Sequence, residues 1–132
     1  MKKILLISTI LLTATICFGQ TEDTITKPAK TLIVEGWDIN KLDIKYIEIV
    51  CYYTYAYGKS WAIRFDIGKI YNPYKGKKYI NENGESIDFN SPMDALNYIT
   101  ECGWEFVSNN GGSDGKVTSL FYLMRKKKIL NN

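Results

Sequence analysis

The chain has 132 residues, of which 45% are hydrophobic and 23% are charged, and its formal net charge is +3. These proportions exclude a disordered, collagen-like or multi-span membrane protein and are those of a single folded domain. Histidine is absent, which excludes an imidazole base, a Ser-His-Asp triad and a histidine-bound zinc ion. The sequence also has no Walker loop, dinucleotide fingerprint, CxxC pair or calcium loop. It therefore predicts no catalytic residue, no metal site and no cofactor.

Residues 1–19 have the layout of a secretory signal peptide. Lys2 and Lys3 precede an apolar run from Ile4 to Leu12, and small or polar residues then lead to Gly19, after which we expect cleavage. The apolar run is shorter than a bilayer span, so no membrane span is predicted. Cleavage removes 19 of the 132 residues, leaves 113, and lowers the net charge from +3 to +1. The sequence thus predicts export, to the periplasm or to the medium.

Cys17 raises the alternative of a lipoprotein, in which an acylated cysteine becomes the first residue. Ile16 stands just before it, where such sites normally have a small residue, so we do not expect a lipid anchor. A mature chain that is close to neutral has no long-range field to attract nucleic acid. Nucleic acid is therefore not predicted as a partner.

The mature chain begins with residues 20–43, which we interpret as a mobile leader with at most one short edge strand. Residues 44–57 are rich in Ile, Val, Tyr and Thr, which favours a strand. A second strand is expected over residues 61–67. Depending on the strand register, its apolar face is made either of Trp61, Ile63, Phe65 and Ile67 or of the residues that alternate with them. These two strands predict a long hairpin.

Residues 72–90 predict a second, smaller hairpin. The apolar pieces Tyr79-Ile80 and Ile87-Asp88-Phe89 stand on either side of Asn83-Gly84. Both turn residues tolerate positive φ, so a tight turn is expected there.

A helix of about ten residues is predicted to begin at Pro92. Ser91 is suited to cap it, proline is favoured at the first helical position, and Asp94 can reach back toward the cap. Gly103 is placed where a left-handed residue would end the helix. The apolar stripe of the helix consists of Ala95, Leu96, Ile99 and Cys102. Because so short a helix is marginal in water, this stripe has to lie on a sheet.

Two further strands follow the helix. The third begins with residues 104–107, in which Trp104 is expected to anchor the helix end to the sheet. Residues 109–115 are expected to be an exposed flexible loop. Residues 117–124 are expected to form the fourth strand. The fold class predicted for residues 44–128 is therefore α+β. It is a four-stranded antiparallel sheet, in the order strand, strand, small hairpin, helix, strand, strand, with the helix packed on one face. Residues 129–132 are expected to be a tail.

Three stretches resemble a family of short secreted bacterial proteins of unknown function. They are Ile-Asp-Phe-Asn-Ser at 87–91, Met-Asp-Ala-Leu-Asn-Tyr at 93–98 and Gly-Trp-Glu-Phe-Val at 103–107. The signature of this family is Asp-Ala-Leu-Asn followed by Gly-Trp-Glu-(Phe/Leu)-Val, and the resemblance spans residues 45–127. Because the family has no established activity, the resemblance implies only a fold and secretion. The chain departs from the family pattern at Cys51 and Cys102.

Cys51 and Cys102 are the two cysteines left after cleavage, an even number in an oxidising compartment. Cys51 lies on the strand face of Ile47 and Ile49, and Cys102 lies on the helix stripe that covers this face, so both thiols point into one interlayer space. A disulfide would close a loop of roughly 50 residues and contribute about 4 kcal/mol. The alternative is two free, buried thiols. The sequence leaves both open, but without histidine it does not predict a catalytic thiol.

An aromatic row along the first hairpin is the candidate binding surface. It consists of Tyr52, Tyr53, Tyr55, Tyr57 and Trp61. Strand alternation sends Tyr53 and Tyr55 to one face and Tyr52 to the other, so the row cannot lie wholly in the core. Exposed aromatic side chains can stack on a sugar or on a partner protein. Cross-strand packing that merely stabilises the hairpin is the simpler interpretation.

Charged residues offer two weaker candidates. Glu48 and Asp66 are expected to be neighbours across the hairpin, and a pair of carboxylates can serve a hydrolase, although acidic residues on a wet strand face usually only solvate it. The run from Arg125 to Lys128 can contact anionic lipid or nucleic acid, although a solubilising end or an edge guard is its usual role.

We therefore expect an exported, non-enzymatic module that acts through protein interaction, assembly or ligand binding. Exposed strand edges and the aromatic hairpin make a homodimer or another protein partner reasonable, and a small ligand is the other option. The alternative from a different class is a small periplasmic or extracellular hydrolase that uses carboxylates.

Overall fold

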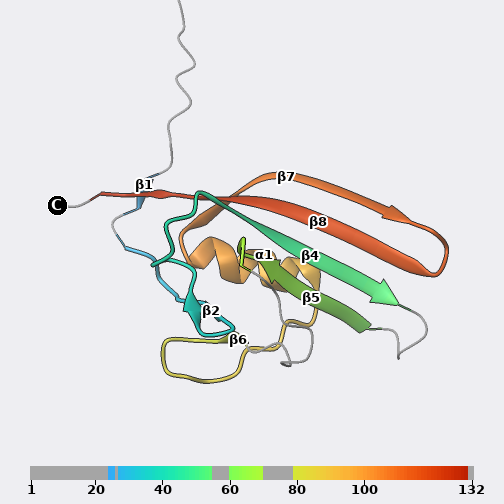
Figure 1. Ribbon diagram of the computed structural model, residues 1–132, viewed down its shortest axis with the longest axis horizontal. Coiled ribbons are helices and arrows are strands. Elements are labelled where there is room, and N and C mark those ends of the chain that lie inside the picture. The colour runs from blue at the N-terminus through green and yellow to red at the C-terminus, as the bar shows by residue number, and fades with distance from the viewer. Residues whose placement is uncertain (1–23, 26, 55–59, 70–78, 131–132) are drawn as a thin grey trace, which may run out of the picture.

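A four-stranded antiparallel sheet is the main layer of the fold. The structure is a computed structural model, and it describes residues 24–25, 27–54, 60–69 and 79–130. The sheet consists of β4 (Tyr46–Thr54), β5 (Ser60–Asp66), β7 (Trp104–Ser113) and β8 (Val117–Lys126). Its strand order is β5-β4-β8-β7, with every neighbouring pair antiparallel (Figure 1). The predicted class, α+β with antiparallel strands and one helix, is confirmed.

The β4–β5 hairpin sorts its side chains by alternation. Ile49 lies opposite Phe65 and Cys51 lies opposite Ile63, and all four side chains are buried. On the other side of β4, Met124 of β8 lies opposite Ile47 and is also buried. These side chains share one face of the sheet, here called the inner face, and they belong to the main hydrophobic cluster.

Helix α1 (Pro92–Glu101) begins at a capped N-terminus. The Ser91 hydroxyl accepts a hydrogen bond from the backbone N–H of Asp94 at 3.1 Å. The Asp94 carboxylate reaches back to accept one from the N–H of Asn90, also at 3.1 Å. One backbone donor of the first turn and one just before the cap therefore have partners within the same short segment.

The apolar stripe of α1 lies on the inner face. Ala95 and Ile99 are fully buried, and Leu96 packs against the cluster from its rim. Gly103 has a φ of +89°, which only glycine adopts readily, and it turns the chain from the helix into β7. Trp104, fully buried, follows at once and donates from Nε1 to Oδ1 of Asn40 at 3.0 Å.

A three-stranded sheet corrects the boundary that we placed at residue 44. It consists of β2 (Ile33–Val34), β3 (Trp37–Asp38) and β6 (Tyr79–Ile80), in the order β3-β2-β6. Leu32, Val34 and Ile39 are at most 3% exposed and belong to the main cluster. This part of the expected leader is therefore core, because large aliphatic side chains gain too much from burial to stay in water.

The small hairpin forms around a turn at residues 81–85. Ile80 bridges Ser86 in antiparallel fashion, and Gly84 has a φ of +80°. The Asn81 side-chain oxygen accepts hydrogen bonds from the N–H groups of Asn83 and Glu85, each at 2.9 Å. The turn thus fixes the direction in which the chain returns toward β5.

Strand β7 is longer than the sequence predicts. Residues 109–113, expected to be part of a loop, pair with β8, and a bulge at Val107 shifts the register between Phe106 and Ser108. The expectation was wrong because Gly111 fits closely against β8: a Cβ there would lie 2.7 Å from the carbonyl oxygen of Ser119. Glycine usually indicates a loop, but here the absence of a side chain at Gly111 lets β7 pair closely with β8.

The two ends of the described chain meet. Strand β1 (Thr24–Ile25) pairs in parallel with β9 (Lys128–Ile129). The expected tail, residues 129–132, therefore begins inside a strand, and its residues 131–132 lie outside the described part. Thr24, where the described chain begins, therefore lies beside Lys128.

Candidate functional site

The aromatic row of the first hairpin is divided between the two faces of the sheet. Tyr53 lies opposite Trp61, with ring centroids 5.1 Å apart and planes tilted by 52°. Tyr52 points to the other face, and all three side chains are half-buried. Tyr55 and Tyr57 lie outside the described residues. The described part of the row is thus a packed pair on the inner face and a single tyrosine on the outer face.

Trp61 also lines a hollow of about 290 Å³, here called the β5 groove. One wall is residues 61–63 of β5, and the other is residues 86–89, which follow the small hairpin. Tyr79 lines it as well, and its hydroxyl donates to the backbone carbonyl of Ile63 at 3.1 Å. The groove therefore runs along the backbone of an edge strand.

The walls of the β5 groove combine apolar and polar groups. Trp61, Ile87 and Phe89 supply apolar surface, whereas Ser86 and Asp88 supply an exposed hydroxyl and an exposed carboxylate. Among the strands that the structure describes, β4 is the sole neighbour of β5. The other side of β5 therefore directs backbone N–H and C=O groups toward the groove, as an edge strand does.

A series of contacting aromatic rings connects the lining of the β5 groove to α1. Phe65 contacts Tyr79 edge-on, at a centroid distance of 5.1 Å, and contacts Phe89 at 5.5 Å. Phe89 in turn contacts Tyr98 of α1 at 5.7 Å. Burial raises the pKa of Tyr98 to about 12, so its hydroxyl stays protonated and donates to the carbonyl of Thr31 at 3.0 Å. The aromatic side chains that line the groove are thus connected through Tyr98 to α1 and to the segment before β2.

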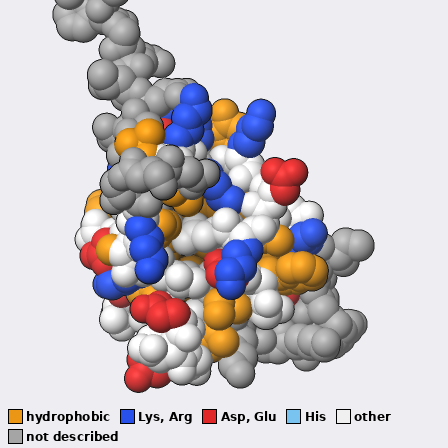
Figure 2. All heavy atoms as spheres, turned by 90° about the vertical axis from the view of Figure 1, so that its left-hand side faces the viewer, with side chains coloured by type: hydrophobic (Ala, Val, Ile, Leu, Met, Phe, Trp, Pro, Cys, Tyr) orange, Lys and Arg blue, Asp and Glu red, His pale blue; other side chains and the backbone are white. Residues whose placement is uncertain are grey.

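A second hollow, of about 460 Å³, lies where β4 begins and β8 ends, and is here called the basic hollow. Its lining consists of residues 43–46, Glu105 and residues 125–128, so five cationic side chains face two carboxylates there. Arg125 pairs with Glu105 at 2.6 Å across β7 and β8. Figure 2 views this end of the molecule and shows Lys and Arg side chains among hydrophobic ones.

Lys126 is fixed by the fold. Its Nζ donates to the carbonyl of Leu42 at 2.6 Å and to that of Asn40 at 3.3 Å, and it lies 5.4 Å from the ring centre of Trp104. Burial lowers the pKa of Lys126, while the nearby Asp43 and Asp38 raise it. One member of the basic run is therefore a structural cation that holds the segment before β4.

Cys51 and Cys102 are free and fully buried in the structure. Burial raises the pKa of Cys51 to about 11 and that of Cys102 to about 12. Cys51 lies in the middle of β4, between Ile63 and Leu120, whereas Cys102 caps the C-terminus of α1. Of the two alternatives that the sequence left open, the structure has the free thiols. Protonated and buried sulfur is unsuited to act as a nucleophile.

Glu48 and Asp66 lie directly opposite each other on β4 and β5. Asp66 uses Oδ1 to accept a hydrogen bond from the N–H of Gly68 at 2.9 Å. Neither carboxylate lines the β5 groove or the basic hollow. The two carboxylates are therefore neighbours, as in a hydrolase, but neither of the two hollows would bring a substrate to them.

Sequence reasoning did not predict the second wall of the β5 groove. Tyr79 and Phe89 stood out only as parts of a small hairpin, and the aromatic residues on both sides of the Asn-Gly turn were the one signal that this hairpin packs on something. Similarly, Asp43 and Lys45 of the basic hollow are distant in sequence from residues 125–128. Only the pairing of β4 with β8 brings them together.

Comparison of the chain with protein-family models, with curated proteins and with solved structures finds no match. Within residues 24–25, 27–54, 60–69 and 79–130, no helix has the length and apolar character to cross a membrane. The same residues contain no cluster of three or more histidine, cysteine, aspartate or glutamate side chains arranged for a metal ion. The geometry of the two hollows is therefore what a functional proposal has to rest on.

Proposed function

We propose that the protein is an exported, non-enzymatic binding module that holds an extended segment of a partner protein in the β5 groove. The observation that carries the proposal is that one wall of the groove is the edge of a strand. A bound peptide can pair with that edge, as in other cases of strand addition. The signal peptide, the export and the resemblance to short secreted bacterial proteins are predictions from the sequence and belong to the same proposal.

The side chains of the groove fit such a segment. In an extended peptide, alternate residues point the same way, so one side chain can pack on Trp61 while a neighbouring donor reaches Asp88 or Ser86. The hydroxyl of Tyr79 already donates a hydrogen bond to the carbonyl of Ile63. A bound segment would therefore pair with the Trp61 end of β5. A second copy of this chain is one protein able to offer such a segment, and it would form the homodimer considered above.

The proposal can be tested by selection from a phage library of random peptides against the exported protein. We expect selected peptides to bind, to shift the NMR signals of residues 61–63 and 86–89, and to lose at least tenfold in affinity with Trp61→Ala. Trp37→Ala is the matched control, because Trp37 is an exposed tryptophan on β3 that does not line the groove.

Two results would overturn it. Peptides that bind Trp61→Ala as tightly as the parent protein would place binding elsewhere, and an empty selection together with a positive glycan array would favour a sugar ligand. Turnover of peptides or glycans that disappears with Glu48→Gln or Asp66→Asn would replace the binding module by the hydrolase. Sedimentation at several concentrations separates a homodimer from a foreign partner.

A further inference from the structure

The geometry of the basic hollow points to a second function, contact with the surface of an anionic phospholipid membrane. The hollow lies at the start of β4 and the end of β8, whereas the β5 groove lies on the outer edge of β5. The inference therefore does not depend on the proposed peptide binding.

Charge is the first argument. The lining of the hollow includes five cationic residues, Lys45, Arg125 and residues 126–128, and two anionic ones, Asp43 and Glu105. The ammonium of Lys126 is held by the carbonyls of Asn40 and Leu42, so Lys45, Arg125, Lys127 and Lys128 are the cations that can contact a phosphate. The net charge of this lining is +3, which equals that of the full chain and exceeds the +1 expected once residues 1–19 are removed. Glu105 orients the Arg125 guanidinium by a 2.6 Å contact, and a guanidinium is suited to phosphate recognition. The volume of the basic hollow, about 460 Å³, is large enough to hold a phosphate headgroup.

Exposed apolar side chains around the hollow are the second argument. Tyr46, which lines it, is 50% exposed, and Ile129 and Leu130, which directly follow its basic run, are 44% and 50% exposed. Cationic side chains next to exposed aromatic and aliphatic ones are the combination that binds an interface between headgroups and acyl chains. A soluble anion would use the charges but would have no use for these apolar neighbours.

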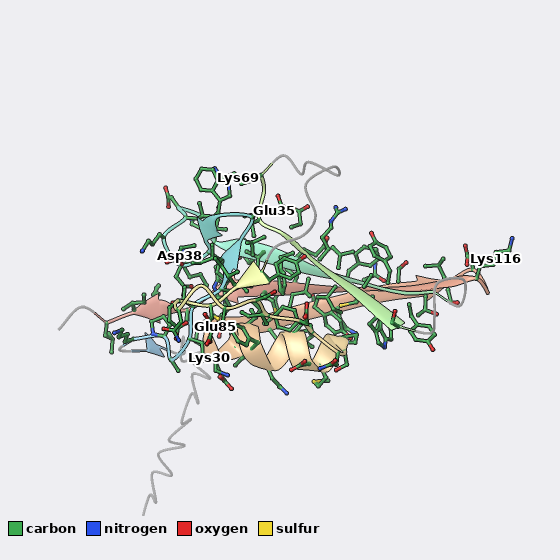
Figure 3. All side chains as sticks on the ribbon, turned by 90° about the horizontal axis from the view of Figure 1, so that it is seen from below. Lys30, Glu35, Asp38, Lys69, Glu85 and Lys116 are labelled. Atoms are coloured by element: carbon green, nitrogen blue, oxygen red, sulfur yellow. The ribbon has the colours of Figure 1, made fainter. Side chains whose placement is uncertain are left out.

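The test is co-sedimentation of the exported protein with vesicles of phosphatidylglycerol and phosphatidylcholine, with pure phosphatidylcholine vesicles as the neutral arm. We expect binding to the anionic vesicles that weakens with added salt and is at least tenfold weaker on the neutral ones. Changing both Lys127 and Lys128 to Gln should lower it further, by about fivefold per lysine removed. Lys116→Gln is the matched control, because Lys116 lies at the far tip of the β7–β8 hairpin (Figure 3) and should leave binding unchanged.

Circular dichroism of each variant separates a loss of binding from a loss of fold. Equal binding to neutral vesicles, absence of binding to anionic ones, or an equal effect of Lys116→Gln would overturn the inference. If glycerol phosphate binds in free solution, with the same sensitivity to Lys127 and Lys128, and the vesicles do not bind, the hollow takes a soluble anion and the membrane contact is wrong. Peptide binding through Trp61 would stand or fall separately.

Discussion

The two ends of the four-stranded sheet share the same strands but differ in what covers them. At the end under α1, Ile47, Trp104 and Met124 are at most 1% exposed. At the other end, residues 109–113 of β7 are exposed, and Tyr53 and Trp61 are only half-buried. Figure 3 shows Lys116 at the tip of the β7–β8 hairpin, away from the helix.

Helix and strand geometry explains the difference. A helix of ten residues is about 15 Å long, whereas a strand of ten residues such as β7 extends over about 33 Å. One short helix can therefore cover only part of the sheet. We infer that the end under α1 supplies most of the stability, and that the other end and the edge of β5 facing away from β4 are where binding takes place, as far as residues 24–25, 27–54, 60–69 and 79–130 define them.

The largest expected effect concerns the two buried thiols, Cys51 in the middle of β4 and Cys102 at the end of α1. Cys51 and Cys102 should react with a thiol reagent at least about a thousandfold more slowly in the native protein than after unfolding, because a fully buried group reacts only through opening of the core. Unfolding without reductant should release two reactive thiols per mature chain. If none appears, a disulfide is present and the free thiols of the structure are wrong.

The same thiols give stability a definite pH dependence. Both have folded-state pKa values above the ordinary 9.0, at about 11 and about 12. Above pH 9 the unfolded thiols lose their protons while the native ones keep them, so the free energy of unfolding should fall as the pH rises from 9 toward 11. Urea titrations over that range measure this fall, and replacing both cysteines by alanine should reduce it.

Next in size is the loss of a core side chain. Ile99→Ala removes a fully buried side chain of α1 and should lower the free energy of unfolding by about 2–5 kcal/mol. Leu120→Ala, on the half-buried part of β8, should cost clearly less. Equal losses in urea denaturation would mean that a half-buried side chain at the margin of the main cluster contributes as much stability as a fully buried one under α1.

The smallest effect tests the strand pairing of the uncovered end. A Cβ at Gly111 would lie 2.7 Å from the carbonyl oxygen of Ser119 and 2.8 Å from Cδ2 of Leu120, so Gly111→Ala should cost about 1–3 kcal/mol. The adjacent Gly112 has nothing within 4 Å of such a Cβ, and Gly112→Ala should be neutral or slightly stabilising. Thermal unfolding measures both; two neutral results would mean that residues 109–113 do not pair with β8.

Local sequence signals predicted most of the elements. The bounds of α1 follow from Ser91, Pro92 and Gly103, because capping chemistry and backbone preference act over a few residues. The alternation in β4 and β5 predicted which side chains reach the inner face, since the strand period of two does not depend on distant partners. For the aromatic row, the same rule predicted the division between Tyr52 and Tyr53.

Tertiary structure decided the rest, because it depends on residues far apart in sequence. Leu32, Val34 and Ile39 looked like part of a leader and belong to the core. Residues 109–113 looked like a loop and are strand. In each case a distant partner supplied burial or backbone pairing. The β5 groove exists only because residues 86–89 return beside Trp61. The basic hollow exists only because β4 and β8 pair. The sequence by itself thus determined α1, the main strands and the faces of β4 and β5, because these depend on local capping and alternation. Both candidate sites arose from long-range packing, which no local pattern encodes.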